Sequence, residues 1–319
     1  MLAMRVQELG GALVAEEVAA PEPGPGEALV RVAAAGVNFA DTLMVQGRYQ
    51  ERPEPPFAPG LEVAGEVIAL GAGAAGPAPG TRVAAVCGHG GFAEQVCVPA
   101  SACVALPDAM EMAEAAALQV AYGTAHLALG RRARLQPGER LLVLGAAGGV
   151  GLTAVEIGRL MGAEVIAVAR GADRLARAEA AGARHLLDSD TADIRAEVKA
   201  LGGADVVFDP VGGELWVAAL RACNPEARLL PIGFASGEVP QIPANILLVK
   251  NLTVIGLYWG AYYRFAPEVM GESLRQLIAW HGEGRIRPHI SHRLPLAEAN
   301  EALRLLRDRE ATGKVVLTV

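Results

Sequence analysis

Aromatic residues, paired cysteines and runs of one charge are all scarce in this 319-residue sequence. Aromatics make up 4% of the residues and hydrophobic residues 52%, so the core has to be built from aliphatic and small side chains. The four cysteines, Cys87, Cys97, Cys103 and Cys223, contain no C-x-x-C pair. This spacing indicates neither a zinc ribbon nor a disulfide framework. We expect reduced and mostly buried thiols.

Clusters of positive charge and long apolar runs are also missing. The formal net charge is -7, and the Lys and Arg residues are scattered along the chain. That pattern argues against a nucleic-acid surface and a polybasic membrane anchor. The first eleven residues lack the features of a secretory signal, and the apolar segment 141–155 is too short and too glycine-rich to cross a bilayer. We expect a cytoplasmic protein with no nucleic-acid or membrane partner.

The pattern of predicted secondary structure changes once along the chain. Short β-branched runs separated by Gly and Pro fill the first third, which is typical of a β-rich domain. From about Met110, a helical apolar segment leads into a repeated alternation of strand-like and helix-like segments. Such alternation predicts βαβ units and a parallel sheet covered on both faces, so the fold class is α/β.

A glycine-rich turn follows the first strand of the alternating region, in the stretch LLVLGAAGGVG at 141–151. Strand, turn and helix in this order are the context of a dinucleotide fingerprint. Ala146, Gly148 and Gly151 occupy the G-x-G-x-x-G positions, and the helix N-terminus would supply N–H groups and a positive dipole end to a pyrophosphate. The predicted cofactor-binding residues of this turn are Ala147, Gly148, Gly149 and Val150. The alternative is a strand-to-helix turn that holds no ligand.

The end of the second strand of this region favours NADPH over NADH. An acidic residue there holds the ribose 2′-OH of NAD, whereas a 2′-phosphate needs a cation. Arg170 ends this strand, Arg174 lies one turn into the next helix and Ser189 follows the third strand. Guanidinium groups bind phosphate oxygens in a bidentate way. The alternative is that both arginines are solvated, and Asp173 and Asp188 are the local arguments against NADPH.

Five motifs give the chain a family resemblance. They are GVNFADTLMVQGRY from Gly36 to Tyr49, PGLEVAGEV from Pro59 to Val67, the glycine-rich turn, VVFDPVGG from Val206 to Gly213, and ATGKVVL from Ala311 to Leu317. In this order and spacing, the chain resembles the medium-chain dehydrogenase/reductase superfamily, and within it the zinc-free quinone oxidoreductases of the ζ-crystallin-like branch.

The resemblance covers essentially the whole chain and implies a two-domain architecture. A GroES-like, β-rich catalytic domain would comprise residues 1–118 and 259–319. A Rossmann domain, with a doubly wound parallel sheet that binds NADPH, would comprise residues 119–258.

Two positions argue against zinc. Zinc-dependent relatives carry a cysteine and a histidine ligand where this chain has Asn38 and Leu61, and catalytic zinc needs three protein ligands. The segment for a four-cysteine zinc lobe is missing as well. We therefore predict no metal. Without a Lewis acid, the acceptor has to accept hydride unaided, as a quinone or an α,β-unsaturated carbonyl does.

The resemblance implies catalytic roles for three residues of the first domain. Asn38 would hydrogen-bond the cofactor or the substrate carbonyl beside Asp41, and the phenol of Tyr49 would donate to a developing oxyanion. The alternatives are that Asn38 and Asp41 cap a helix and that Tyr49 is a packed aromatic. Leu43 stands where some members carry a second tyrosine, so a mechanism that needs two phenols is not supported.

The resemblance also implies further cofactor-binding residues, which are Thr124, Val211, Phe234, Tyr258, Trp259 and Lys314. Thr124 and Lys314 match positions near the nicotinamide, and the other four follow later strand ends, where open α/β sheets bind ligands. The alternative for the three aromatic residues is a place in the core or in an interface.

The segment NLTVIGL at 251–257 is short and apolar, and an edge strand of this kind can pair with its copy in a second subunit. The family that the chain resembles forms dimers in this way, so the resemblance implies a homodimer. The alternative is a covered edge in a monomer. Three functions remain open: NADPH-dependent reduction of a quinone or activated enone, reduction of an enoyl thioester such as an enoyl-CoA, and NADPH binding without turnover.

Overall fold

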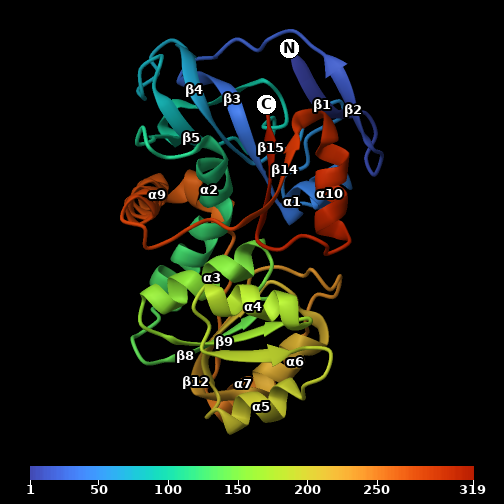
Figure 1. Cartoon of the computed structure of the whole chain (residues 1–319), viewed down its shortest axis with the longest axis vertical. Coiled ribbons are helices and arrows are strands. Elements are labelled where there is room, and N and C mark those ends of the chain that lie inside the picture. Colours follow the sequence, from blue (N-terminus) through green and yellow to red (C-terminus); the bar gives the residue numbers. More distant parts are fainter. The chain divides into compact units, whose positions relative to one another are not determined.

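The computed structural model describes residues 1–319, which fold as two compact units. Unit 1 comprises Met1–Gly123 and Gly260–Val319, and unit 2 comprises Thr124–Trp259. Figure 1 shows the helices and strands of each unit. The domain limits expected from the sequence, 1–118 with 259–319 and 119–258, stay a prediction.

Unit 2 is built on a six-stranded parallel sheet with the strand order β10-β9-β8-β11-β12-β13. Its strands are β8 (Arg140–Leu144), β9 (Glu164–Ala169), β10 (His185–Asp188), β11 (Ala204–Asp209), β12 (Cys223–Pro231) and β13 (Thr253–Val254). The chain runs outward from β8 to β10, returns to β11 on the other side of β8, and continues outward to β13. This reversal beside β8 is the topological switch point at which doubly wound sheets bind ligands.

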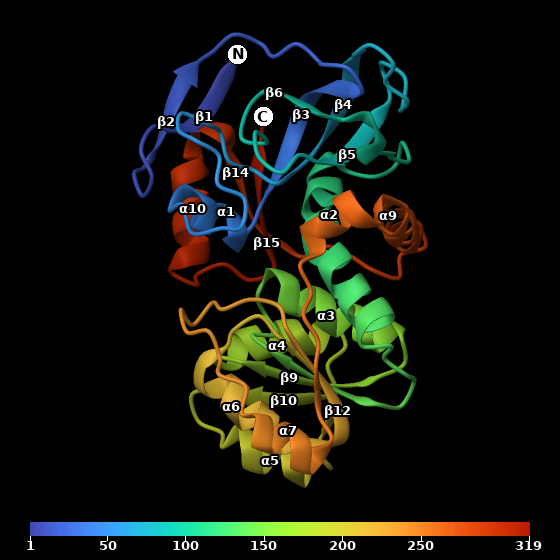
Figure 2. The same cartoon turned by 180° about the vertical axis from the view of Figure 1, so that it is seen from behind.

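Helices cover both faces of this sheet (Figures 1 and 2). They are α3 (Gly149–Leu160), α4 (Ala172–Ala180), α5 (Ile194–Ala200), α6 (Gly213–Ala222) and α7 (Ala244–Lys250). Leu142 and Leu144 of β8 share one apolar cluster with residues of α5, α6 and α7. The preceding residue, Leu141, faces Gly158 of α3 instead. Successive residues of β8 have neighbours in different helices, which explains why the strand is apolar throughout.

Unit 1 contains a seven-stranded, mostly antiparallel sheet and a separate hairpin of β1 and β2. Its strands are β1 (Leu2–Val6), β2 (Leu13–Glu17), β3 (Glu27–Val37), β4 (Glu62–Leu70), β5 (Arg82–Val86), β6 (Gln95–Pro99), β7 (Cys103–Ala105), β14 (Ile290–Pro295) and β15 (Lys314–Thr318). The long strand β3 pairs with β4, β6 and β15. Because Val315 lies opposite Val37, the last strand brings Lys314 beside Asn38.

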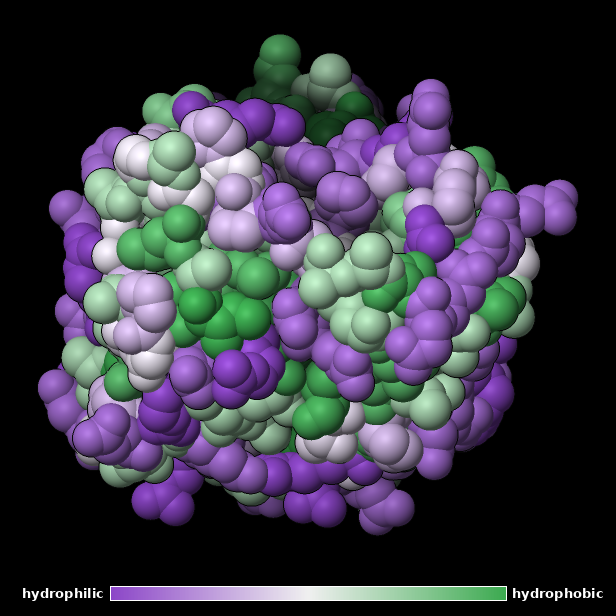
Figure 3. Space-filling model, turned by 90° about the horizontal axis from the view of Figure 1, so that it is seen from above, coloured by the Kyte–Doolittle hydropathy of each residue, from purple (hydrophilic) through white to green (hydrophobic).

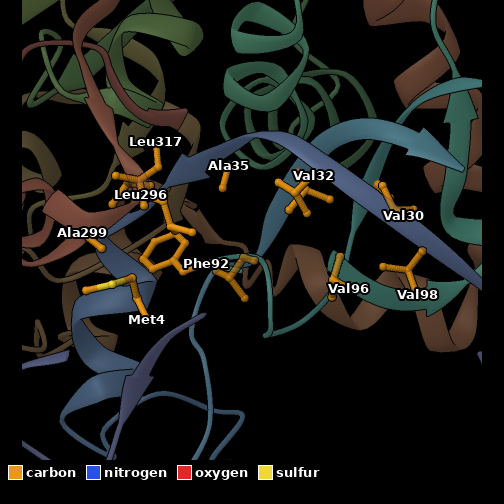
Figure 4. Close-up of a cluster of buried hydrophobic side chains, with 14 of the residues drawn as sticks. Met4, Val30, Val32, Ala35, Phe92, Val96, Val98, Leu296, Ala299 and Leu317 are labelled. Carbon is orange, nitrogen blue, oxygen red and sulfur yellow. The ribbon is translucent and has the colours of Figure 1, made fainter. Parts of the chain in front are cut away.

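The helices of unit 1 pack around this sheet. They are α1 (Phe39–Val45), α2 (Met112–His126), α8 (Tyr262–Phe265), α9 (Pro267–Gly282) and α10 (Ala299–Arg307). The core joins distant parts of the chain: Met4 of β1, Phe92, Leu296 just before α10 and Ala299 at its start lie together (Figure 4). These residues are aliphatic, with phenylalanine as the main aromatic, as the composition requires.

The predicted α/β class, with a β-rich unit and a doubly wound parallel sheet, is confirmed. One strand is shorter than expected, because NLTVIGL contributes only the two residues of β13. No helix meets the length and apolarity that a bilayer crossing demands. On the face seen in Figure 3, apolar side chains form small patches separated by hydrophilic ones.

Candidate active site

The turn between β8 and α3 has the close packing that a nucleotide cradle requires. A Cβ on Gly151 would lie 2.1 Å from the carbonyl oxygen of Gly145, so the helix can approach the strand only with glycine there. Gly148 is exposed, and as the N-cap of α3 it provides no side-chain cap. The backbone N–H groups of Gly149, Val150 and Gly151 have no hydrogen-bond acceptor within the protein. Such orphan donors at a positive helix end suit a phosphate group.

Arg170 extends from the end of β9 and is half-exposed. Its Nε lies 3.3 Å from Oδ1 of Asp190, so a carboxylate lies beside this guanidinium. The carboxylate of Asp188 is engaged elsewhere, since its Oδ1 accepts N–H groups from Gly171 at 3.1 Å and Asp190 at 3.0 Å. These bonds hold the loops after β9 and β10 together and keep the pKa of Asp188 below its usual value. Ser189 joins the same pair of loops through its N–H, which donates to Ala169.

The loop after β11 is fixed by a buried carboxyl group that the sequence analysis did not select. Oδ1 of Asp209 accepts the N–H groups of Val211 at 2.7 Å and Gly212 at 2.9 Å. Burial raises the pKa of Asp209. Val211 meets the glycine-rich turn, because a Cβ on Gly145 would lie 2.8 Å from Cγ2 of Val211. The ends of β8 and β11 thus touch at the switch point.

The other predicted cofactor residues of unit 2 lie in different settings. Thr124 and Arg174 are half-buried, on α2 and α4. Phe234 is 40% exposed in the loop after β12, Tyr258 is half-buried, and Trp259 is buried. Their contact with a cofactor stays a prediction.

In unit 1, two predicted residues, Asn38 and Lys314, join one buried network with a third residue, Glu62. The ammonium of Lys314 donates to Oδ1 of Asn38 at 2.7 Å and to Oε1 of Glu62 at 2.8 Å. It also donates to the carbonyl of Val37 at 3.0 Å, so all three of its protons are committed inside the unit. Glu62 is fully buried, and its second oxygen accepts the N–H of Val120 on α2 at 2.8 Å.

Asp41 stabilises the backbone around this network. Its two oxygens accept the N–H groups of Asn38 at 2.7 Å and Gly60 at 3.1 Å, and its side chain is fully buried. Asp41 therefore caps α1, while the amide of Asn38 turns to Lys314 and Glu62. Tyr49 is partly buried against the core of unit 1. The catalytic roles of Asn38, Asp41 and Tyr49 stay predictions.

No group of three or more His, Cys, Asp or Glu side chains has an arrangement that would hold a metal ion. The position expected for a histidine ligand, Leu61, is buried and apolar.

Comparison with known proteins decides the family. Residues 24–108 match the alcohol dehydrogenase GroES-like domain, and residues 149–277 match the zinc-binding dehydrogenase family. The quinone oxidoreductase-like protein 2 homologue of Nematostella vectensis is 40% identical, over 99% of this chain and 88% of its own length. The chain belongs to the quinone oxidoreductase branch of the medium-chain dehydrogenase/reductase superfamily.

Solved structures of this branch share the fold of this oxidoreductase. The quinone oxidoreductase of Thermus thermophilus, described also in complex with NADPH, is 37% identical with a TM-score of 0.88. The Escherichia coli quinone oxidoreductase complexed with NADPH is 27% identical with a TM-score of 0.93. In both comparisons 100% of each chain is covered. The predicted family is thereby confirmed.

Three acidic residues of this oxidoreductase were not predicted from the sequence, namely Glu62, Asp190 and Asp209. A partial signal was present, since Glu62 opens the mostly apolar strand EVAGEVIAL and Asp209 ends the mostly apolar strand ADVVFD. A buried carboxyl group in such a strand needs a hydrogen-bonding partner. The pattern alone does not single out these two residues, because Glu66 and Asp205 lie in the same strands.

We expect the buried carboxyl group of Asp41 to make stability depend on pH. Burial raises its pKa to about 7, although hydrogen bonds from the N–H groups of Asn38 and Gly60 and the charge of Lys314 oppose the rise. The unfolded chain releases this proton near pH 4, before the folded protein does. The carboxyl group's contribution to stability should therefore be largest below pH 4, fall between about pH 4 and pH 7, and stay level above.

The measurement is the urea denaturation midpoint of the wild type and of Asp41→Asn from about pH 4.5 to 8, which spans the expected fall. The wild type should lose stability relative to the variant as the pH rises to about 7. Glu22→Gln, at an exposed position, is the control and should follow the wild type at every pH. A constant difference between wild type and Asp41→Asn would contradict the prediction.

Proposed function

We propose that this protein transfers hydride from NADPH to a quinone or an α,β-unsaturated carbonyl without using zinc. The observation that carries the proposal is the N-terminus of α3, where three backbone N–H groups have no acceptor within the protein and only glycine fits at position 151. Bound NADPH would supply the hydride. The chain would bind and orient the cofactor and the acceptor and exclude water from them.

The relatives support NADPH as the cofactor. Two quinone oxidoreductases that match this chain over its whole length are described in complex with NADPH. The loops after β9 and β10 fit the same cofactor, because the half-exposed guanidinium of Arg170 follows the end of β9 and the carboxylate of Asp188 accepts backbone N–H groups. A bound 2′-phosphate would share this guanidinium with Asp190, whose Oδ1 lies 3.3 Å from Nε.

The buried network of unit 1 supports a reaction without zinc. Asn38 stands where zinc-dependent relatives carry a cysteine ligand. Its side-chain oxygen accepts a hydrogen bond from the ammonium group of Lys314. Glu62 has the same ammonium as its counter-charge. In this proposal, the phenol of Tyr49 donates the proton that the reduced acceptor needs.

The test follows NADPH absorbance with purified, metal-free protein. The acceptors are 9,10-phenanthrenequinone, 1,4-benzoquinone, 1-octen-3-one and crotonyl-CoA, each repeated with NADH. Rapid oxidation with a quinone or the enone supports the proposal. Turnover with crotonyl-CoA alone would favour an enoyl-thioester reductase, and tight NADPH binding without oxidation of any acceptor would leave only a binding role.

Arg170→Ala tests the proposed contact with the 2′-phosphate. A hydrogen bond between charged groups contributes about 1.5–3 kcal/mol, so kcat/KM for NADPH should fall about tenfold to a hundredfold. The value for NADH should change less than about threefold, since it has no phosphate at that position. The control is Arg177→Ala, an exposed arginine of α4. An unchanged ratio of NADPH to NADH in Arg170→Ala would rule out this contact.

We also propose a homodimer in the cytoplasm. Strand β13 lies at the edge of the parallel sheet. Leu248 and Val249 of the preceding helix are 75% and 72% exposed, which is costly for apolar side chains in a monomer. The molar mass in solution, by light scattering, distinguishes a dimer from a monomer. The cytoplasmic location rests on the sequence arguments given above.

A further inference from the structure

The side-chain amide of Asn38 is held by two buried, oppositely charged groups. Its Oδ1 accepts from the ammonium of Lys314 at 2.7 Å, and its Nδ2 donates to Oε1 of Glu62 at 2.8 Å. The relative exposures are 9% for Asn38, 3% for Lys314 and 0% for Glu62. A hydrogen bond to a charged group in such a setting is stronger than one between neutral groups.

These partners allow only one orientation of the amide. Turning it over would place the N–H groups against an ammonium, which has only donors, and the oxygen against a carboxylate, which has only acceptors. Both contacts would become repulsive at once. The charges therefore select the orientation, in addition to the packing.

The amide has no donor left for a ligand. One N–H of Nδ2 is bonded to Glu62, and the other reaches the carbonyl of Gly36 at 3.4 Å. Oδ1 has a second lone pair beside the one that Lys314 uses. What Asn38 can offer a ligand is therefore an acceptor.

We propose that Lys314 and Glu62 are positioning residues, which fix the Asn38 amide so that it presents its oxygen, and not its nitrogen, to the bound cofactor or substrate. The group that meets Asn38 is then a hydrogen-bond donor, such as an amide N–H or a hydroxyl, and not a carbonyl oxygen. This inference rests on the proposed function for the ligand, while the orientation itself is a property of unit 1.

A double variant separates positioning from stability. Lys314→Met alone leaves the carboxylate of Glu62 without its counter-charge and should be strongly destabilised. Adding Glu62→Gln removes that charge, and the new amide can accept from Val120 with its oxygen and donate with its nitrogen to Oδ1 of Asn38. This arrangement is satisfied only when the Asn38 amide turns over.

The kinetic readout compares Lys314→Met with the double variant Lys314→Met/Glu62→Gln. The double variant should recover most of the lost urea midpoint. Its kcat is measured at saturating NADPH, because Lys314 is itself a predicted cofactor-binding residue. Its kcat with phenanthrenequinone should stay at least about tenfold below the wild-type value. Recovery of kcat together with the midpoint would overturn the proposal, because the network would then be purely structural. A midpoint that stays as low as in Lys314→Met would also count against it.

The orientation can be read without turnover. The chain has five asparagines, so [15N]asparagine labelling gives five side-chain amide pairs, and Asn38→Ala identifies the pair of Asn38. In the double variant, these protons should show a nuclear Overhauser effect to the methyl group introduced at position 314. Absence of that contact would overturn the proposed orientation. If the wild type binds NADPH but oxidises it with no acceptor, only the proposed function fails. The orientation of the Asn38 amide is still tested, because the nuclear Overhauser measurement does not require turnover.

Discussion

Gly151→Ala is expected to destabilise unit 2 by about 3 kcal/mol, the upper part of the range for overpacking, and to weaken NADPH binding at least about tenfold. The added Cβ would lie 2.1 Å from the carbonyl oxygen and 2.9 Å from the carbonyl carbon of Gly145. These are backbone atoms, so no side chain can move aside. Helix α3 has to shift away from β8 and carries its N-terminal N–H groups with it.

Gly148→Ala provides the matched control for this prediction. Its backbone has φ -77°, which alanine adopts easily, and its Cβ would lie 3.4 Å from the same oxygen, an ordinary contact. Urea denaturation should therefore match the wild type within about 0.5 kcal/mol. NADPH binding should still weaken, because the methyl group would stand where the proposed pyrophosphate approaches. Equal stability of Gly151→Ala and the wild type would contradict the prediction, because it would mean that a Cβ at position 151 fits beside the carbonyl group of Gly145.

Unit 2 was largely predictable because its information is local. An apolar strand, a glycine-rich turn and a helix follow one another over a short stretch of chain, so the pattern alone located the candidate nucleotide cradle. The contacts of Arg170 were not predictable in this way. Its partner Asp190 lies beyond the end of the next strand, and only the parallel pairing of β9 and β10 brings the two loops together.

The buried network of unit 1 could not be predicted from local sequence patterns. Family motifs pointed to Asn38 and Lys314 separately, yet their common partner Glu62 was overlooked. Lys314 and Glu62 lie 252 positions apart, and no periodicity connects them. Gly36 admits the carboxylate, since a Cβ there would lie 2.5 Å from Oε1 of Glu62. That requirement appears only once β3 and β4 are paired.

Glu62→Gln is expected to lower the free energy of unfolding by about 3–5 kcal/mol, which is typical when one partner of a buried ion pair is removed. The new amide has the same shape but carries a nitrogen in place of one oxygen. If the nitrogen faces α2, it meets the N–H of Val120, and if it faces the network, it meets the ammonium of Lys314. In either orientation two donors oppose each other, and the ammonium loses its charged partner.

The same substitution elsewhere on β4 isolates the effect of burial. Glu66 pairs with Arg31 at 3.7 Å, and their side chains are 41% and 61% exposed. Solvent screens such a pair, so Glu66→Gln should cost less than about 1 kcal/mol. Urea denaturation of both variants at neutral pH measures the difference directly. Similar losses of stability in the two variants would contradict the prediction, because the buried ion pair of Glu62 would then contribute no more than the exposed pair of Glu66. A loss confined to Glu62→Gln would mean that the stability of unit 1 depends on the ion pair that also orients Asn38.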